Sequence, residues 1–365
     1  MRQTLIITFL CFVIVSNGVR ASDESPCQVH LILFVPADVD PPTGYQPRVD
    51  QVVEYAESFF QREFRRWGHE NIVMPFRRSA DGHVEVTMMQ GKKATAEYKP
   101  VSVRMEVMDT LRQKDRLSGG RQVWWILMYR GALPVNSSFL GGFGQEIGGW
   151  AVCNLDLIPG RVDPKAELGS EFLKKLTLKG MLHELGHGFQ LPHIGPLRRD
   201  DAGNTLMGPT HFNYARVAPV REERVYLCEA EAAILTTHPA FKGTPDIPGP
   251  LPKINVQNMK YVADRKTNTF IVSGRLSSNK NAVYALVGDE SDARPGEYWT
   301  KTYAGKVSPN GDFEVLVSEP SESSGSLKVW FVFEGGTQTG DGRSRGRESG
   351  ITKTYTYRQR QWTFR

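Results

Sequence analysis

Three histidines and one glutamate fall within residues 183–193, which read HELGHGFQLPH. His183 and His187 are four residues apart, so on a helix they project from the same side. Two imidazoles one turn apart can bind one zinc ion, and Glu184 then lies beside the metal as a base for bound water. A third ligand, His193, leaves a fourth position for that water, whose pKa falls toward about 7 on zinc.

The segment that carries these residues has the pattern of a core-facing helix. Between Phe172 and Phe189, apolar residues recur at helical spacing, at positions 178, 182, 185 and 189. The alternative is that the histidines merely pack against or cap such a helix. A third histidine ten residues after the first makes a metal site the better interpretation.

The motif resembles that of the metzincin clan of zinc endopeptidases, HExxHxxGxxH followed by a methionine turn. The resemblance implies that His183, His187 and His193 bind one Zn²⁺ ion and that Glu184 is the general base. Residues 204–208 (NTLMG) look like the methionine turn, with Met207 as an apolar floor beneath the imidazoles. The similarity extends over roughly residues 28–240 and implies an α/β (α+β) catalytic domain with a mixed sheet.

One position departs from the family pattern. The family's glycine lets the chain leave the helix with φ > 0, and this chain has Gln190 there. A residue other than glycine in that conformation costs on the order of 1 kcal/mol. The third ligand is therefore open to other candidates, which are Asp200, Asp201, Glu222 and Glu223.

A tetrahedral oxyanion needs a hydrogen-bond donor besides the metal. Tyr214 and His211 follow Met207 closely enough in sequence to be candidates. Tyr214 is nearer to the family habit of a tyrosine after the turn, although it comes seven residues on instead of two.

Strands and helices alternate before the motif, which predicts an α/β sheet. Apolar patterns predict strands at 28–36, 84–88 and 123–129 and helices at 49–67 and 101–117. The glycine-rich stretch GGFGQEIGG then leads to a predicted edge strand, made of Gly149, Trp150, Ala151 and Val152 and ending at Cys153. By the family resemblance, a substrate peptide pairs antiparallel with this edge.

The character of the chain changes near residue 240. Residues 241–253 are rich in proline and predict a linker between a catalytic domain (22–240) and a β-sandwich domain (254–365) with short β-type runs. Residues 335–350 (GGTQTGDGRSRGRESG) predict a mobile loop with solvated arginines. Tyr298, Trp299 and Tyr303 form the one aromatic cluster that could bind a glycan or surface ligand, or could equally be core.

Residues 1–21 have a basic start and an apolar run, which predicts a signal peptide and export to an extracellular or periplasmic location. Without Arg2 and Arg20, 43 basic residues face 40 acidic ones, a net charge of +3. With no basic stripe, nucleic acid is excluded as a partner. No membrane span is expected after signal removal. Cys27, Cys153 and Cys228 remain, and export permits one disulfide among them.

These patterns predict a secreted zinc endopeptidase that acts on a peptide or protein substrate. Two alternatives stay open. One is a non-catalytic secreted protein that binds a glycan or protein through its β-sandwich, and the other is a zinc hydrolase of a non-peptide bond.

Overall fold

The structure is a computed structural model of the chain. It describes residues 26–74, 76–113, 122–131, 141–145, 148–197, 203–208, 224–244, 249–264, 266–292, 299–320, 323–358 and 361–365. The signal peptide predicted at residues 1–21 lies outside these ranges. Within them, no helix is both long and apolar enough to cross a membrane.

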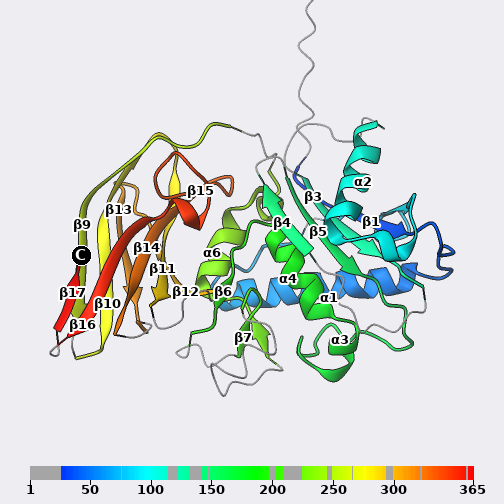
Figure 1. Cartoon of the computed structure of the whole chain (residues 1–365), viewed down its shortest axis with the longest axis horizontal. Coiled ribbons are helices and arrows are strands. Elements are labelled where there is room, and N and C mark those ends of the chain that lie inside the picture. The colour runs from blue at the N-terminus through cyan, green and yellow to red at the C-terminus, as the bar shows by residue number, and fades with distance from the viewer. Residues whose placement is uncertain are drawn as a thin grey trace, which may run out of the picture.

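A five-stranded mixed sheet forms the N-terminal part of the molecule (Figure 1). Its strand order is β2-β1-β3-β5-β4, and β4 alone runs antiparallel to its neighbour. The strands are β1 (Val29–Val35), β2 (Val86–Gln90), β3 (Gln122–Met128), β4 (Gly141–Gln145) and β5 (Gly148–Asn154). The alternation of strands and helices thus gives the expected α/β sheet, with the first three strands close to their predicted positions.

The edge strand is not the one predicted. Gly149–Val152 lie in β5, which pairs with β3 on one side and with β4 on the other. Among the described residues, the edge strand on this side of the sheet is β4 (Gly141–Gln145), and β2 is the edge strand on the other side. The prediction failed because GGFGQEIGG supplies a strand of its own, which folds back over β5 and takes the outer position.

Helices cover both faces of this sheet. Alternate residues of β1 point to opposite faces, as the period of a strand requires. Leu31 and Leu33 join the core beneath α1 (Gln46–Arg66) and α4 (Leu178–Gly188), whereas Ile32 and Phe34 join the core beneath α2 (Pro100–Gln113).

The motif lies on a shorter helix than predicted. The apolar pattern over residues 172–189 is split into α3 (Glu171–Lys175) and α4 (Leu178–Gly188). Thr177, between them, has φ 54°, a left-handed conformation that no α-helix continues through. Leu176 and Leu178 on either side are both buried, so the break keeps the apolar side chains in the core.

Glycines let α4 pack directly against β4 and β5. A Cβ atom added at Gly142 would lie 2.3 Å from the Glu184 carbonyl oxygen, and one at Gly144 would lie 2.6 Å from that of His187. At Gly149 the added atom would lie 1.7 Å from the Gly188 carbonyl oxygen. Because no side chain fits between them, the strand backbones lie against the helix backbone at the motif.

Between α4 and the C-terminal sheets, the described residues form five short elements. They are β6 (Ile194–Gly195), β7 (Asn204–Thr205), β8 (Val225–Tyr226), α6 (Glu229–Thr237) and α7 (Pro239–Lys242). β7 and β8 pair in parallel. α6 contacts three strands of the C-terminal sheet, β11 (Ala282–Ser291), β12 (Thr300–Lys306) and β14 (Ser324–Phe333).

Two sheets form the C-terminal part, and all their strand pairs are antiparallel except that of β12 with β6. A three-stranded sheet has the order β13-β10-β9, and a seven-stranded sheet has the order β17-β16-β14-β11-β12-β6 with β15 beside β14. The strands are β9 (Ile254–Asp264), β10 (Thr269–Ser278), β11 (Ala282–Ser291), β12 (Thr300–Lys306), β13 (Asp312–Val317), β14 (Ser324–Phe333), β15 (Gln338–Thr339), β16 (Ile351–Arg358) and β17 (Gln361–Phe364). Both sheets contribute side chains to one core.

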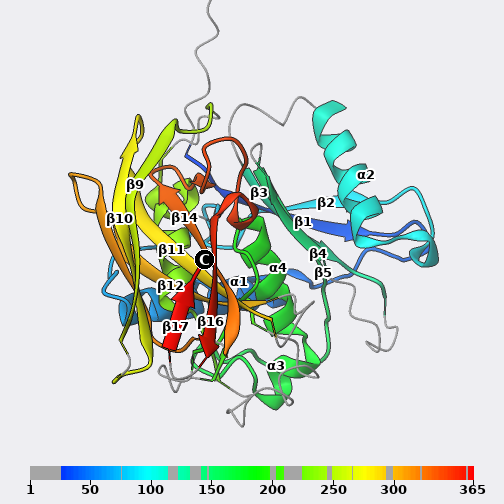
Figure 2. The same ribbon diagram turned by 60° about the vertical axis from the view of Figure 1, so that its left-hand side comes forward.

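The N-terminal and C-terminal parts are joined by packing and by a shared sheet. β6, which directly follows His193, pairs in parallel with β12. The core beneath α4 also contains Leu286 and Trp330 from the C-terminal sheet. Figure 2 shows α4 between the five-stranded sheet and the C-terminal sheets. The domain boundary at 241–253 remains a prediction, but the two parts that it would separate share a core.

Two local expectations are wrong. Residues 335–350 are not a solvated loop, since they contain β15 and a short 3₁₀ helix (Arg347–Ser349), with Gln338 and Thr339 buried. Cys27, Cys153 and Cys228 are each buried thiols, and no disulfide links them to one another. Each cysteine occupies its own place in the core and packs there as a small apolar residue.

We predict that Gly149→Ala lowers the free energy of unfolding by at least about 2 kcal/mol, because the added methyl group collides with rigid helix backbone. Gly188→Ala is the matched control on the opposite side of the same contact. Its methyl group would lie 3.3 Å from the end of the Val123 side chain, which can move, so a smaller loss is expected. Chemical denaturation of both variants makes the comparison, and equal losses would contradict the backbone packing described here.

Candidate metal centre

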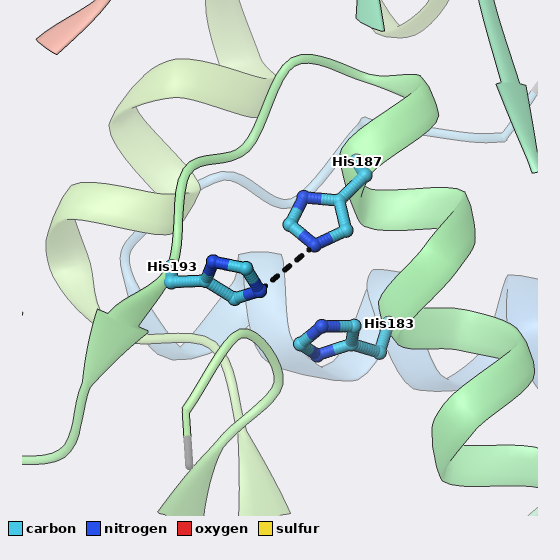
Figure 3. Close-up of side chains that lie close together, drawn as sticks. All are labelled: His183, His187 and His193. Carbon is cyan, nitrogen blue, oxygen red and sulfur yellow. Dashed lines mark hydrogen bonds between the residues drawn. The ribbon is translucent and has the colours of Figure 1, made fainter. Parts of the chain in front are cut away.

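The three motif histidines converge on one point. His183 and His187 project from α4, and His193 faces them from the returning chain (Figure 3). Their candidate ligand atoms all lie within 4.8 Å of one another, and the two Nε2 atoms of His187 and His193 are 3.1 Å apart. In the described part of the chain, these histidines are the one group of three or more His, Cys, Asp or Glu side chains that could hold a metal ion. The three predicted ligands therefore lie close together in the structure.

Backbone carbonyls orient two of the three rings. His183 Nδ1 lies 2.8 Å from the carbonyl oxygen of Leu206, and His187 Nδ1 lies 2.9 Å from that of Leu191. Since a carbonyl only accepts hydrogen bonds, each Nδ1 carries the proton and donates it. Each Nε2 is then unprotonated and carries its lone pair toward the other histidines, which is the tautomer that a metal ligand needs.

Burial favours the neutral form of the rings. It is the main cause that lowers the pKa of His183, and His187 adds to the effect. Burial also lowers the pKa of His187. The pKa of His193 falls to about 4, mainly through burial and to a smaller extent through His187 and Arg347. Neutral imidazole is the form that binds metals.

Gln190 adopts the left-handed conformation that the family's glycine would supply, with φ 68°. Around it, α4 ends in a Schellman motif: the Leu191 amide donates to the Gly186 carbonyl, and the Gln190 amide donates to that of His187. The chain therefore reverses within a few residues and returns His193 to the other two histidines.

The returning segment is held from both sides. On one side, the Thr300 amide donates to the His193 carbonyl (3.3 Å), and the ring of Trp299 occupies the space where Gly195 has no side chain. On the other side, the Thr205 hydroxyl donates to the Ile194 carbonyl. The third histidine thus directly precedes a short strand, β6, that is held by the C-terminal sheet on one side and by Thr205 of β7 on the other.

Glu184 lies on α4 directly after the first histidine, half-buried. Burial raises its pKa to about 7 in the metal-free protein. A carboxyl group with a pKa in this range can both accept and release a proton near neutral pH. The helix backbone at Glu184 lies against Gly142 of the edge strand β4.

The turn at residues 205–208 lies beneath α4. Met207 is fully buried, and its sulfur would lie 2.6 Å from a Cβ atom on Gly186, so it packs against the helix between the histidines in sequence. The same turn supplies the Leu206 carbonyl that accepts from His183. Met207 and its turn therefore support the helix that carries the motif.

Glu231 is a residue that the motif analysis missed. One of its carboxyl oxygens accepts from the Met207 amide (2.9 Å), and the other accepts from the Cys228 amide (2.8 Å) at the start of α6. It is a capping-box glutamate whose second oxygen reaches the turn beneath the metal centre. Cysteine at the cap position hid the signal, because serine or threonine is usual there.

The segment predicted as a loop supplies two more residues. Gln338 is buried, and its side-chain amide donates to the Gln190 carbonyl at 3.0 Å. Arg347 donates to the Thr300 hydroxyl at 2.6 Å and lowers the pKa of His193 through its charge. No local sequence pattern marks either of them.

Several candidates lie outside the described residues. They are Tyr214, His211, Asp200, Asp201, Glu222, Glu223 and Tyr298. The other two aromatic residues of the predicted glycan-binding cluster are core residues. Trp299 packs on Gly195, and Tyr303 is buried with its hydroxyl donating to the Glu319 carbonyl.

The fold has counterparts among solved structures. Two crystal forms of wild-type OgpA from Akkermansia muciniphila are similar to this chain at 19% sequence identity. One has a TM-score of 0.70, over 94% of this chain and 97% of OgpA. The other has a TM-score of 0.71, over 97% of this chain and 99% of OgpA. Catalytically inactive OgpA in complex with an O-glycopeptide substrate, glycodrosocin, matches with a TM-score of 0.67 at 18% identity, over 94% of this chain and 96% of that one. No family model and no curated protein matches the sequence. These likenesses establish a shared fold across nearly the whole chain.

We predict that Glu231→Gln flattens the pH dependence of stability. Burial, with a smaller contribution from Glu63, raises the pKa of Glu231 to about 8, against 4.5 ordinarily, despite the two amides that lower it. The folded state therefore holds this proton more tightly than the unfolded chain does. The contribution is full below about pH 4.5 and is lost as pH rises toward 8. Chemical denaturation from about pH 4 to about pH 9, a range that spans this window, measures the free energy of unfolding as a function of pH.

The control for this prediction is Glu229→Gln, in the same helical turn, which should keep the slope of the original protein. If Glu231→Gln shows that slope as well, Glu231 is ionised in the folded state and the prediction is wrong.

Proposed function

We propose that this chain is a zinc-dependent endopeptidase that cleaves O-glycosylated peptides. The observation that carries the proposal is the convergence of three imidazoles from the HExxH helix and the returning chain. A peptidase is one of the reaction classes that such a centre with an adjacent carboxylate can perform.

The residues present fit a zinc ion. Imidazole nitrogen is a preferred zinc ligand, and three protein ligands leave one position for water, as in catalytic zinc sites. The hydrogen bonds from His183 and His187 Nδ1 to backbone carbonyls are the outer-shell contacts such ligands have. His183, His187 and His193 would hold the ion.

A bound zinc ion supplies a Lewis acid and lowers the pKa of its water. Glu184 accepts a proton from water at its carboxylate and delivers it to the nitrogen of the leaving amine. The edge strand β4, which lies against α4 at Glu184, offers unpaired backbone groups to an extended peptide. This strand takes the role that the sequence had given to residues 149–152.

The substrate class comes from the structural likeness to OgpA, whose inactive form binds an O-glycopeptide. The likeness covers both parts of the chain, so a glycan beside the scissile bond could contact either. The metzincin-like catalytic domain, the β-sandwich and export to an extracellular or periplasmic space through residues 1–21 belong to the same proposal.

We predict that the purified protein holds about one zinc ion and that His193→Ala sharply lowers this content. Metal analysis after dialysis measures it. His83→Ala is the control, because His83 is exposed and pairs with Asp50 of α1, outside the group of three histidines. Equal zinc in all three proteins would remove His193 from the site and make Asp200, Asp201, Glu222 and Glu223 the candidates. No zinc in any of them would reject the metallopeptidase.

We predict that Glu184→Gln keeps its zinc and loses cleavage of an O-glycopeptide by at least about 100-fold, since the proton acceptor is gone. Product formation is followed by mass spectrometry, with the unglycosylated peptide alongside. Glu171→Gln, which alters an exposed glutamate on α3, should cleave normally. Equal cleavage of both peptides would retain the peptidase and reject the glycopeptide preference.

A further inference from the structure

The left-handed turn at Gln190 is in contact with a residue 148 positions away in sequence. The side-chain amide nitrogen of Gln338 donates to the Gln190 carbonyl at 3.0 Å. Gln338 is 4% exposed and Gln190 is half-buried, so the donor end of this bond is shielded from competing water.

The orientation of the Gln338 amide is determined by its two partners. Trp330 Nε1 can only donate, and it lies 3.3 Å from Gln338 Oε1. The Gln190 carbonyl can only accept, so it must face the amide nitrogen. Trp330 is fully buried at the centre of the sheet, and it therefore fixes the rotation of Gln338.

Gln190 needs such a partner because it carries a side chain in a conformation suited to glycine. Its own side chain is accommodated at Gly144 of β4, where a Cβ atom would lie 2.6 Å from Gln190 Cγ. Contacts at the carbonyl and at the side chain therefore hold the residue from two directions. Its backbone then directs the chain to His193, three residues later.

We propose that Gln338 is a positioning residue for the third metal ligand. By holding the Gln190 carbonyl, it keeps the chain in the left-handed turn that brings His193 to His183 and His187. The inference rests on the proposed metal site, and it assigns the C-terminal part of the chain a role in metal binding.

Gln338→Met tests this, since methionine has a similar length and no donor. Zinc affinity, measured by competition with a chelator, should weaken roughly tenfold, as for other outer-shell changes. Gln90→Met is the matched control: it removes a side-chain amide that donates to a backbone carbonyl, that of Pro36, on the opposite edge strand of the five-stranded sheet, so zinc affinity should stay within about twofold.

A second background separates positioning from a general loss of structure. In Gln190→Gly, the turn is unstrained without help, so adding Gln338→Met should change zinc affinity by less than about twofold. The visible spectrum of the cobalt-substituted protein should shift in Gln338→Met alone and return in the double variant, because it reports the ligand geometry. If Gln338→Met does not fold, Gln338→Glu at alkaline pH replaces it, keeping the acceptor for Trp330.

Equal weakening in both backgrounds would overturn the inference, since Gln338 would then act on stability alone. Unchanged zinc affinity in Gln338→Met, together with a loss in His193→Ala, would overturn the inference and leave the proposed function standing. Unchanged affinity in His193→Ala would overturn the metal site and the inference with it.

Discussion

The metal centre depends on the reversal of the chain at the end of α4. The helix presents His183 and His187 from one face, and the third histidine reaches them only because Gln190 has a positive φ. An ordinary residue there costs on the order of 1 kcal/mol, and a buried hydrogen bond contributes a similar amount. The bond from Gln338 is thus of the right size to offset the strain, whereas a surface ion pair is worth less. Geometry that a glycine would provide locally is here supported by a distant part of the chain.

The same helix imposes a second constraint on the strands beside it. Gly142, Gly144 and Gly149 have no side chain of their own, so at these three positions the strand backbones lie close to the backbone of α4. This close approach holds the edge strand against the helix backbone at Glu184. Glycine normally weakens a strand, and its repetition here is explained by the space that the helix takes. The catalytic motif and the glycine-rich stretch therefore require each other, although about forty residues of sequence separate them.

Local patterns predicted what local physics determines. Helical spacing of apolar residues located α1 and α4, and the four-residue spacing of His183 and His187 fixed their common side. The break at Thr177 and the exchange of edge strands were missed, because both depend on packing partners outside the segment. Composition misled at residues 335–350: glycine and arginine predict a solvated loop, yet Gln338 and Arg347 bond to residues of other elements. Glu231 was missed because cysteine stands at the cap position of its capping box, and its second contact, with the amide of Met207, depends on the tertiary fold.

The position of β6 makes the C-terminal sheet part of the centre. His193 directly precedes this strand, which pairs with β12, while the Ile194 carbonyl also accepts from Thr205 in the turn beneath α4. A displacement of the sheet relative to α4 would pull on the third ligand through its own backbone, whatever happened to side-chain contacts. The shared core, with Trp330 packed among residues of α4, opposes that displacement, because separating the parts would expose buried apolar surface. A metal bound by the three histidines would oppose it too, joining α4 to the strand. Metal binding and association of the two parts must therefore stabilise each other.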